Sequence, residues 1–565
     1  MRSAFQFATR GVLVLAVLST GAGSMAQVLT RTQSEFFENK VRPIFVNDCY
    51  KCHSKEAPKL KGRLSLESRE GWLTGGNSGP AIVPGNPDAS LLIKAIRYTN
   101  EDLQMPPKGR RLSDSEIADL ETWVKMGAPD PRVAIVTSAG KNSKMSPRDH
   151  WAFQPIKNPP VPEAKATRWI QTPVDNFILA KLEENGMEPN RIADKWTLIR
   201  RATFDLIGLP PSTQEVKDFV DDNSPDAFAK VIDRLLQSPH YGERWGRFWL
   251  DTARYSDTKG EVRKNQEDYR YPYAWTYRDY VIRAFNEDKP FNRFIIEQMA
   301  ADKLVRTQPD KTIAAAMGFL TVGERFQEKQ NDIINDRIDV VTKGFLGLTV
   351  TCARCHDHKF DPIPTQDYYS LHGVFASCYE PAPYPVIEYG NSSNRADYFK
   401  QAMPLENQLV QLEQQRQGAR GDRQKVRQIL TEIGSVKVAF TDLELTHPGA
   451  PVRAMILEDS PNPQDSPVFI RGEAENKGEI VPRRFLQILS PANRVPFRNG
   501  SGRLELAADI VDKNNPLTSR VIVNRVWLHH FGEGIVTTPD DFGNQSAPPS
   551  HPELLDYMAT RFMAE

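Results

Sequence analysis

Apolar residues recur at helical spacing at both ends of the first region of the chain. Between residues 34 and 49 they occupy positions 36, 37, 41, 44 and 45, which is the spacing of one buried helix face. A second run begins with the capping pattern of Ser113 and Glu116 and ends at Gly127. Its expected buried stripe is Ile117, Leu120, Trp123 and Val124. These patterns predict a small helical domain over residues 33–130.

The rest of the chain continues mainly with helical patterns. Residues 150–385 predict a larger helical domain that is rich in aromatic residues. Leucine spacing over 399–435 predicts a helical hairpin, and alternation over 436–490 predicts short strands before helices return at 500–565. We therefore expect a mainly α multidomain protein whose mixed C-terminal domain, 436–565, is truncated.

Length and charge narrow the possible partners. The chain has 565 residues, more than a single compact core usually holds, and residues 131–149 have the polar composition of a linker. Lys plus Arg and Asp plus Glu both number 72, so the net charge is zero. This balance gives no reason to expect a nucleic acid or an anionic membrane as a partner.

Residues 1–26 have the layout of a secretory signal peptide. Arg2 and Arg10 precede the apolar run 11–18, and small residues follow up to Ala26. An uncleaved membrane anchor is the alternative, but the apolar run is short for a spanning helix. We expect cleavage after Ala26, no membrane span in the mature chain, and a periplasmic or otherwise exported protein.

Four of the five cysteines belong to two Cys-x-x-Cys-His motifs. The first motif consists of Cys49, Cys52 and His53. The second consists of Cys352, Cys355 and His356. Two thiols and an imidazole in one short turn are what covalent haem attachment needs. A disulfide framework does not explain the two histidines, a thioredoxin-like pair needs a βαβ context, and a zinc site needs a second ligand pair at suitable spacing. We expect two haem c groups, one at each motif.

The second axial ligand differs between the two motifs. Met105 lies in a stiff loop before the last helix of the first domain, so we expect His53 and Met105 to ligate the first iron. For His356 the opposite ligand stays open among His150, His240 and His372, or the position is free.

Two further interpretations stay open around the second motif. His358 is too near His356 to reach the opposite haem face, and Asp361 is either its hydrogen-bond partner or a solvated charge. In the helical run before this motif, Asp251 and Asp257 either line a pocket with Arg254 or pair with it.

Long stretches of the chain resemble a known family. "VRPIFVNDCYKCHS" and "MPPKGRRLSDSEIADLETWVKMGAP" resemble a planctomycete-type cytochrome c domain, "CARCHDHKFDPIPTQDYYSLHGVF" resembles the unknown-function region after it, and "NPLTSRVIVNRVWLHHFGEGIVTTPDDFG" resembles a second such region. The resemblance implies a large exported bacterial cytochrome, with Cys49, Cys52 and His53 as haem ligands, Met105 as the further ligand, and the second motif as part of the pattern.

These observations predict an exported dihaem c-type cytochrome that transfers electrons, and that is more an electron carrier than a defined enzyme. Its expected partner is a redox protein or a quinol-linked chain. Two alternatives remain, an oxidoreductase that acts on a small molecule or sugar, and a surface protein that binds a polysaccharide.

Overall fold

The computed structural model describes residues 33, 36–54, 60–99, 103–107, 111–130, 147–165, 167–262, 268–419 and 421–564. The predicted signal peptide and most of the predicted linker lie outside these residues. The chain divides into two compact units, Met1–Lys144 and Met145–Glu565. It is mainly helical, as predicted, and the described part contains no helix with both the length and the apolar character needed to cross a bilayer.

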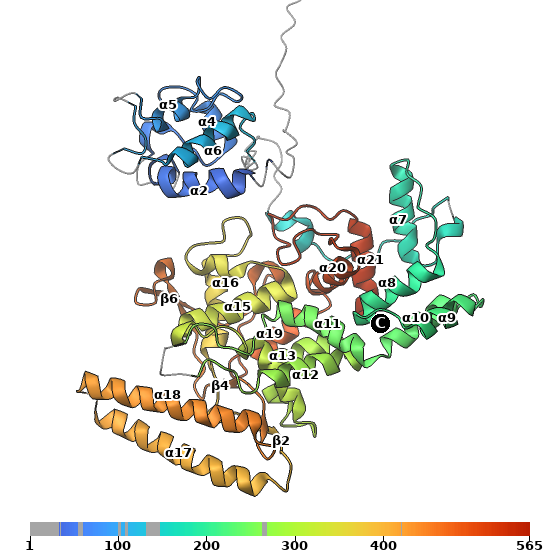
Figure 1. Ribbon diagram of the computed structural model, residues 1–565, viewed down its shortest axis with the longest axis vertical. Helices are drawn as coiled ribbons and strands as arrows, with labels where there is room; N and C mark the ends of the chain where they lie inside the picture. Colours follow the sequence, from blue (N-terminus) through green and yellow to red (C-terminus); the bar gives the residue numbers. More distant parts are fainter. Residues whose placement is uncertain are drawn as a thin grey trace, which may run out of the picture. The chain divides into compact units, whose positions relative to one another are not determined.

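The first unit, whose ribbon runs from blue to cyan in Figure 1, packs short helices around a cluster of aromatic rings. The Trp123 ring lies 5.6 Å from the rings of Phe37 and Phe45, and 5.9 Å from that of Trp72. The predicted capping box of Ser113 and Glu116 is present and begins the last helix. The elements are the π-helical turns η1 (Phe37–Val41) and η2 (Phe45–Cys49), the 3-10 turn η3 (Lys61–Arg63), and α2 (Arg42–Ile44), α3 (Tyr50–His53), α4 (Arg69–Thr74), α5 (Leu91–Ile96) and α6 (Asp114–Lys125).

The second unit is built around one large apolar core. That core takes residues from 152–378 and again from 454–555, so the two sequence regions share it. The helices are α7 (Pro173–Glu184), α8 (Lys195–Ile207), α9 (Thr213–Asp221), α10 (Ala227–Leu236), α11 (Pro239–Thr252), α12 (Ala274–Asn286), α13 (Phe291–Leu304), α14 (Gly318–Thr321), α15 (Gln330–Leu346), α16 (Thr365–Ala376), α17 (Arg395–Gly418), α18 (Arg423–Thr446), α19 (Arg503–Val511), α20 (Thr518–Phe531) and α21 (Pro552–Ala564).

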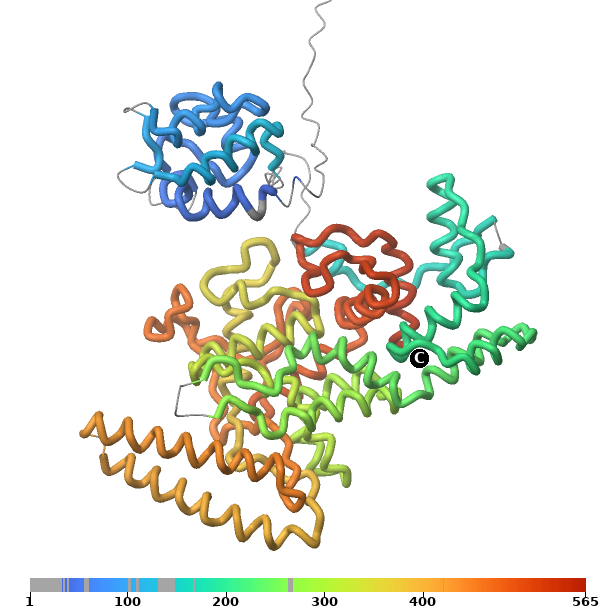
Figure 2. The backbone as a smooth tube through the Cα atoms, viewed as in Figure 1, coloured from blue at the N-terminus to red at the C-terminus, as the bar shows by residue number. Residues whose placement is uncertain are grey.

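The predicted hairpin is longer than its sequence pattern suggested. In Figure 2, α17 and α18 run side by side (orange), and α18 continues to Thr446 through residues predicted to be strand. Val436, Phe440 and Leu443 follow the helical period, and the last two pack near Tyr398 of α17. Burial of that face therefore overrides the local alternation of β-branched residues.

Short strands follow the hairpin, as predicted, and two further strands, Cys378–Tyr379 and Val386–Glu388, precede it. Among the described residues they form three two-stranded antiparallel sheets, with the pairs β1–β4, β2–β3 and β5–β6. Their bounds are β1 (Cys378–Tyr379), β2 (Val386–Glu388), β3 (Val452–Arg453), β4 (Glu458–Asp459), β5 (Ser466–Phe469) and β6 (Lys477–Val481). These short sheets connect segments between the helices and do not form a separate layer of the fold.

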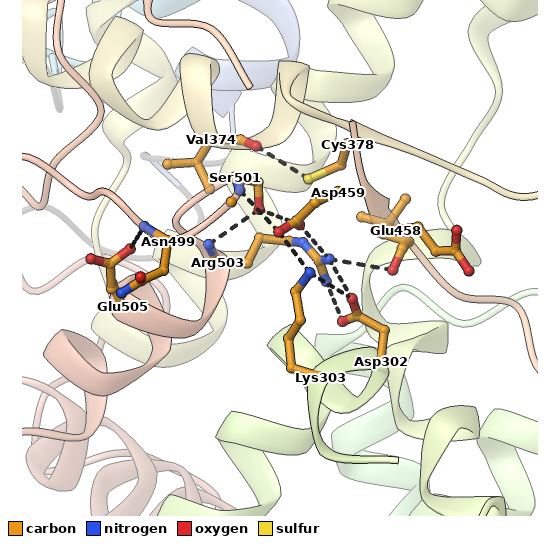
Figure 3. A network of polar contacts seen from close by, with 12 residues as sticks. Asp302, Lys303, Val374, Cys378, Glu458, Asp459, Asn499, Ser501, Arg503 and Glu505 are labelled. Atoms are coloured by element: carbon orange, nitrogen blue, oxygen red, sulfur yellow. Dashed lines mark hydrogen bonds and ion pairs between the residues drawn. The ribbon is translucent and has the colours of Figure 1, made fainter. Parts of the chain in front are cut away.

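A buried charge network joins α13, β4 and α19. The fully buried guanidinium of Arg503 donates to the carboxylates of Asp302 (3.0 Å) and Asp459 (2.8 Å), as Figure 3 shows. Lys303 adds an ion pair to Asp459 at 2.7 Å, and the Ser501 hydroxyl donates to the same carboxylate at 2.6 Å. Segments about 200 residues apart in the chain are thus joined by paired charges inside the core.

Candidate functional site

The first Cys-x-x-Cys-His motif lies at the end of the opening helical run. Cys49 closes the π-helical turn η2, and Cys52 and His53 lie on the short helix α3. Ser54 has extended backbone angles and ends the helix, and its hydroxyl donates to the Tyr50 carbonyl at 2.7 Å. The run therefore places both thiols and the imidazole within about one helical turn, and all three side chains are half-buried.

The His53 ring is held by a backbone carbonyl. Its Nδ1 lies 3.3 Å from the oxygen of Leu64, and an imidazole nitrogen that donates to a carbonyl carries the proton. The Leu66 amide donates to the His53 carbonyl at 2.8 Å, which ties the same segment to the helix end. Within the described residues Nε2 makes no hydrogen bond, which is the arrangement that orients a metal-binding histidine.

The Cys49 thiol is in an environment that disfavours its thiolate. Burial, with a smaller contribution from the neighbouring Asp48 carboxylate, raises the pKa of Cys49 to about 12. A redox-active or zinc-binding cysteine needs the thiolate at neutral pH. The described residues also contain no group of three or more His, Cys, Asp or Glu placed to hold a metal ion. The thiol is therefore held protonated at neutral pH, and thioether attachment at Cys49 remains a prediction.

Met105 lies in a loop that is tied to helix α5. Its amide donates to the Ala95 carbonyl at 3.1 Å, and the next residue, Pro106, accepts from the Tyr98 hydroxyl. The Met105 side chain itself is 36% exposed and lies outside the apolar core of the unit. The backbone is thus fixed while the thioether stays available, so its role as an iron ligand remains a prediction.

The second motif lies on a 3-10 turn, η9 (Val350–Arg354), that is fastened to helix α15. Arg354 donates to the Asp332 carboxylate at 3.0 Å, and the Thr351 hydroxyl donates to Asp339 at 2.8 Å. The side chains of Cys352, Cys355 and His356 are exposed at the surface of the unit.

The exposed thiols and the ring of His356 fit the same donor set as the first motif. Nδ1 of His356 lies 2.7 Å from the carbonyl of Asp357, so Nε2 is again the free nitrogen. Gly472, in the loop after β5, has a positive φ of 76°, and a Cβ there would lie 2.6 Å from the Cys355 sulfur. The β5–β6 loop therefore borders this motif at a position where only glycine fits.

His358 is a structural residue of the motif loop. Its Nδ1 accepts the backbone N–H of Asp361 at 2.8 Å, and its Nε2 lies 3.2 Å from the Thr349 hydroxyl. The ring is buried, and the Asp361 carboxylate lies 3.5 Å from Nδ1. With both nitrogens engaged, His358 holds the loop closed and has no lone pair for iron.

The three histidines considered as a further ligand at the second motif differ in their availability. His372 is buried, and its two nitrogens face the Ser466 hydroxyl at 2.9 Å and the Asn331 side chain at 3.3 Å. His240 lies on α11 and pairs with Glu243 at 2.7 Å. Both nitrogens of His372 are therefore engaged, whereas Nε2 of the exposed His240 has no partner among the described residues.

His150 also keeps Nε2 without a hydrogen bond within the described residues, but unlike His240 it lies near the loop of the second motif. Its Nδ1 accepts the Ala152 amide at 3.4 Å. Burial lowers the pKa of His150, while the nearby carboxylates of Asp361 and Asp541 act in the opposite direction. Because Asp361 belongs to the second motif's loop, His150 shares that neighbourhood and remains the candidate.

The C-terminal region clamps the second motif, a role that the sequence analysis missed. The Asn544 backbone N–H donates to Asp361 Oδ1 at 2.6 Å, and its side chain donates to the Phe360 carbonyl at 3.2 Å. At Gly543 a Cβ would lie 2.4 Å from the Asp361 carboxylate, so the two segments touch. The contact joins positions about 180 residues apart. The polar loop residues around Asn544 form no sequence pattern that predicts it.

Three family models match the chain in the order that the resemblance implied. Planctomycete cytochrome C matches residues 49–109, which include the first motif and Met105. Protein of unknown function (DUF1549) matches 173–380 with the second motif, and Protein of unknown function (DUF1553) matches 502–565 with the Asn544 clamp. No curated protein and no solved structure matches the chain.

Proposed function

Because the chain belongs to the planctomycete-type cytochrome c proteins that carry these two following regions, we propose that it is an exported dihaem cytochrome that transfers electrons. The single observation that carries the proposal is the state of His53. Its Nδ1 is engaged by the Leu64 carbonyl, and its Nε2 is free beside two thiols on the same turn.

The residues of the first motif would hold a haem c from one side. Cys49 and Cys52 would supply the thioether bonds, and His53 and Met105 would supply the nitrogen and sulfur ligands of the iron. When bound, haem c supplies a one-electron Fe(III)/Fe(II) couple. A histidine–methionine ligand pair favours a raised reduction potential, which suits a carrier that accepts electrons from a redox partner protein or a quinol-linked chain.

The second motif would hold another haem c through Cys352, Cys355 and His356. Two Asp side chains of α15 hold the turn η9, which carries Cys352. Asn544 holds Asp361 in the loop that follows His356. A second candidate function, an oxidoreductase acting on a small molecule, is favoured by one observation. Both nitrogens of His372 are engaged and His240 is paired with Glu243, which leaves His150 or no further ligand at this motif.

The decisive experiment counts covalent haem. The full chain is expressed with a haem-attachment system, denatured, and assayed by pyridine haemochrome against protein mass. Two haems per chain are expected, with one lost in Cys49→Ala/Cys52→Ala and the other in Cys352→Ala/Cys355→Ala. A count of one that survives Cys352→Ala/Cys355→Ala would overturn the dihaem proposal.

A further inference from the structure

A cavity of 270 Å³ with both polar and apolar lining opens in the second unit beside Arg254. Its lining includes the side chains of Arg254, Ser256, Thr258, Glu324, Phe326 and Asp336. Arg254 pairs with Asp336 at 2.9 Å, and neither Asp251 nor Asp257 is its ion-pair partner. The sequence left open whether Asp251 and Asp257 line a pocket with Arg254 or pair with it. A pocket is present at Arg254, but the carboxylate that pairs with Arg254 there belongs to Asp336.

The Arg254 guanidinium is held by the protein rather than free to bind an anion. Its Nε donates to Asp336, and its Nη1 donates to the carbonyls of Phe319 at 2.9 Å and Ala253 at 3.1 Å. Nη2 also donates to Asp336, which leaves one of its N–H groups for a ligand. The guanidinium is a rigid part of the cavity wall.

The charges of the cavity select against anions. One guanidinium stands against the carboxylates of Asp336 and Glu324, so the lining has one net negative charge. Within the part of the chain that the structure describes, the Glu324 carboxylate has no hydrogen bond or ion pair, and this side chain is exposed. The hydroxyls of Ser256 and Thr258, 3.0 Å apart, add both donors and acceptors. The Phe326 ring supplies one flat apolar surface.

The backbone around the cavity has unusual conformations. Arg254 has a φ of 50° and Phe326 a φ of 47°, values that non-glycine residues adopt rarely. Strained residues of this kind concentrate where side chains must be aimed at a ligand. Both belong to the cavity lining.

The cavity and the second Cys-x-x-Cys-His motif share helix α15. Asp332, Asp336 and Asp339 occupy positions i, i+4 and i+7 of α15, which is one face of the helix. Asp332 and Asp339 hold the turn that carries Cys352, while Asp336, between them, holds Arg254. The steps along the helix axis are about 6 Å and about 4.5 Å. A molecule in the cavity would therefore contact the same helix that holds the second motif.

We propose that this cavity binds a neutral, hydroxyl-rich small molecule of the size of one sugar ring. Glu324 and Asp336 accept hydrogen bonds from its hydroxyls, the free N–H of Arg254 and the two side-chain hydroxyls complete the pairing, and Phe326 packs against its C–H face. The proposal goes beyond electron transfer, and it does not require haem at either motif.

The test is calorimetric titration of the full haem-loaded chain with D-galactose, D-glucose, D-glucuronate and ethanolamine. At least one neutral sugar is expected to bind, and glucuronate at least tenfold more weakly because of the net negative charge. Glu324→Gln and Phe326→Ala are each expected to weaken sugar binding at least tenfold. Glu328→Gln, the same change at an exposed position outside the lining, is expected to leave it unchanged.

Three outcomes would overturn the proposal. These are the absence of binding by both sugars up to tens of millimolar, stronger binding of ethanolamine or glucuronate, or sugar binding that Glu324→Gln and Phe326→Ala leave intact. Haem content, measured on the same preparations, is independent of these results. Failure of the dihaem proposal and failure of the cavity proposal can thus be told apart.

Discussion

Single side chains around the two motifs decide which nitrogen is left for a ligand. The Leu64 carbonyl fixes the tautomer of His53. The buried ring of His358 is hydrogen-bonded within its own loop. Both motifs read Cys-x-x-Cys-His, yet the first is half-buried and the second exposed. The same three residue types therefore have different surroundings, and these differences set what each site can do.

Replacing Met105 tests the predicted ligand pair directly. Met105→Ala is expected to keep both haems attached but to lower the midpoint potential of one, because a weaker ligand replaces the thioether. A shift on the order of 0.1 V is expected, a fraction of the roughly 0.8 V that axial ligands span. Met126→Ala, a methionine of the same unit with 37% exposure, serves as the control in the redox titration. Equal potentials in both variants would exclude Met105 as a ligand.

Protonation of His372 is expected to couple stability to pH. Burial, assisted by Arg354, lowers the pKa of His372 to about 4, whereas an unfolded histidine titrates near 6.5. The unfolded chain therefore takes up a proton first as the pH falls. The stabilisation is complete above pH ~6.5 and is lost between there and about pH 4, up to roughly 3 kcal/mol.

Urea unfolding at pH 7.5 and 5 measures this dependence. The wild type is expected to lose more free energy of unfolding than His372→Gln does on going to pH 5, because the variant lacks the titrating ring. His240→Gln, at an exposed site, is the control. Parallel pH profiles for the wild type and His372→Gln would refute the assignment.

At the scale of elements, the sequence predicted helices where apolar residues form one helical face. It predicted strands where apolar and polar residues alternate over a short segment. The α6 helix begins and ends where its capping pattern places it. The hairpin of α17 and α18 was recognised from its leucines, but its end was placed too early because residues 436–446 read as alternating. Only the partner face in the fold shows which period is buried.

The charge network between α13, β4 and α19 gives a prediction at this scale. Arg503→Met leaves the carboxylates of Asp302 and Asp459 buried without their main partner. Burial by itself raises the pKa of Asp459, and Arg503, Lys303 and Ser501 outweigh it and hold the pKa well below its usual range. Loss of Arg503 is expected to destabilise the second unit by about 3–5 kcal/mol.

Denaturant unfolding followed by the tryptophan signal checks this value. Arg498→Met, the same substitution at an exposed position five residues earlier, is expected to change the free energy of unfolding by less than about 0.5 kcal/mol. Similar losses in both variants would show that the network does not stabilise the fold.

The whole molecule consists of two compact units, each with one motif and its own core. Loss of haem at one motif is therefore expected to leave the other unit's stability unchanged. In calorimetry, Cys49→Ala/Cys52→Ala is expected to lower one unfolding transition, and Cys352→Ala/Cys355→Ala the other. A common shift of all transitions in either variant would contradict independent units.

What the sequence by itself determined is local in the chain. Both motifs, the capping box, the aromatic helices and the order of the three family regions are readable because their residues lie within a few turns of each other. Tertiary structure alone decided which histidines are engaged, that Asn544 holds Asp361, and that Asp336 rather than Asp251 pairs with Arg254. These contacts join residues about 80 to 180 positions apart, and only packing of the core selects such partners among the many that sequence permits.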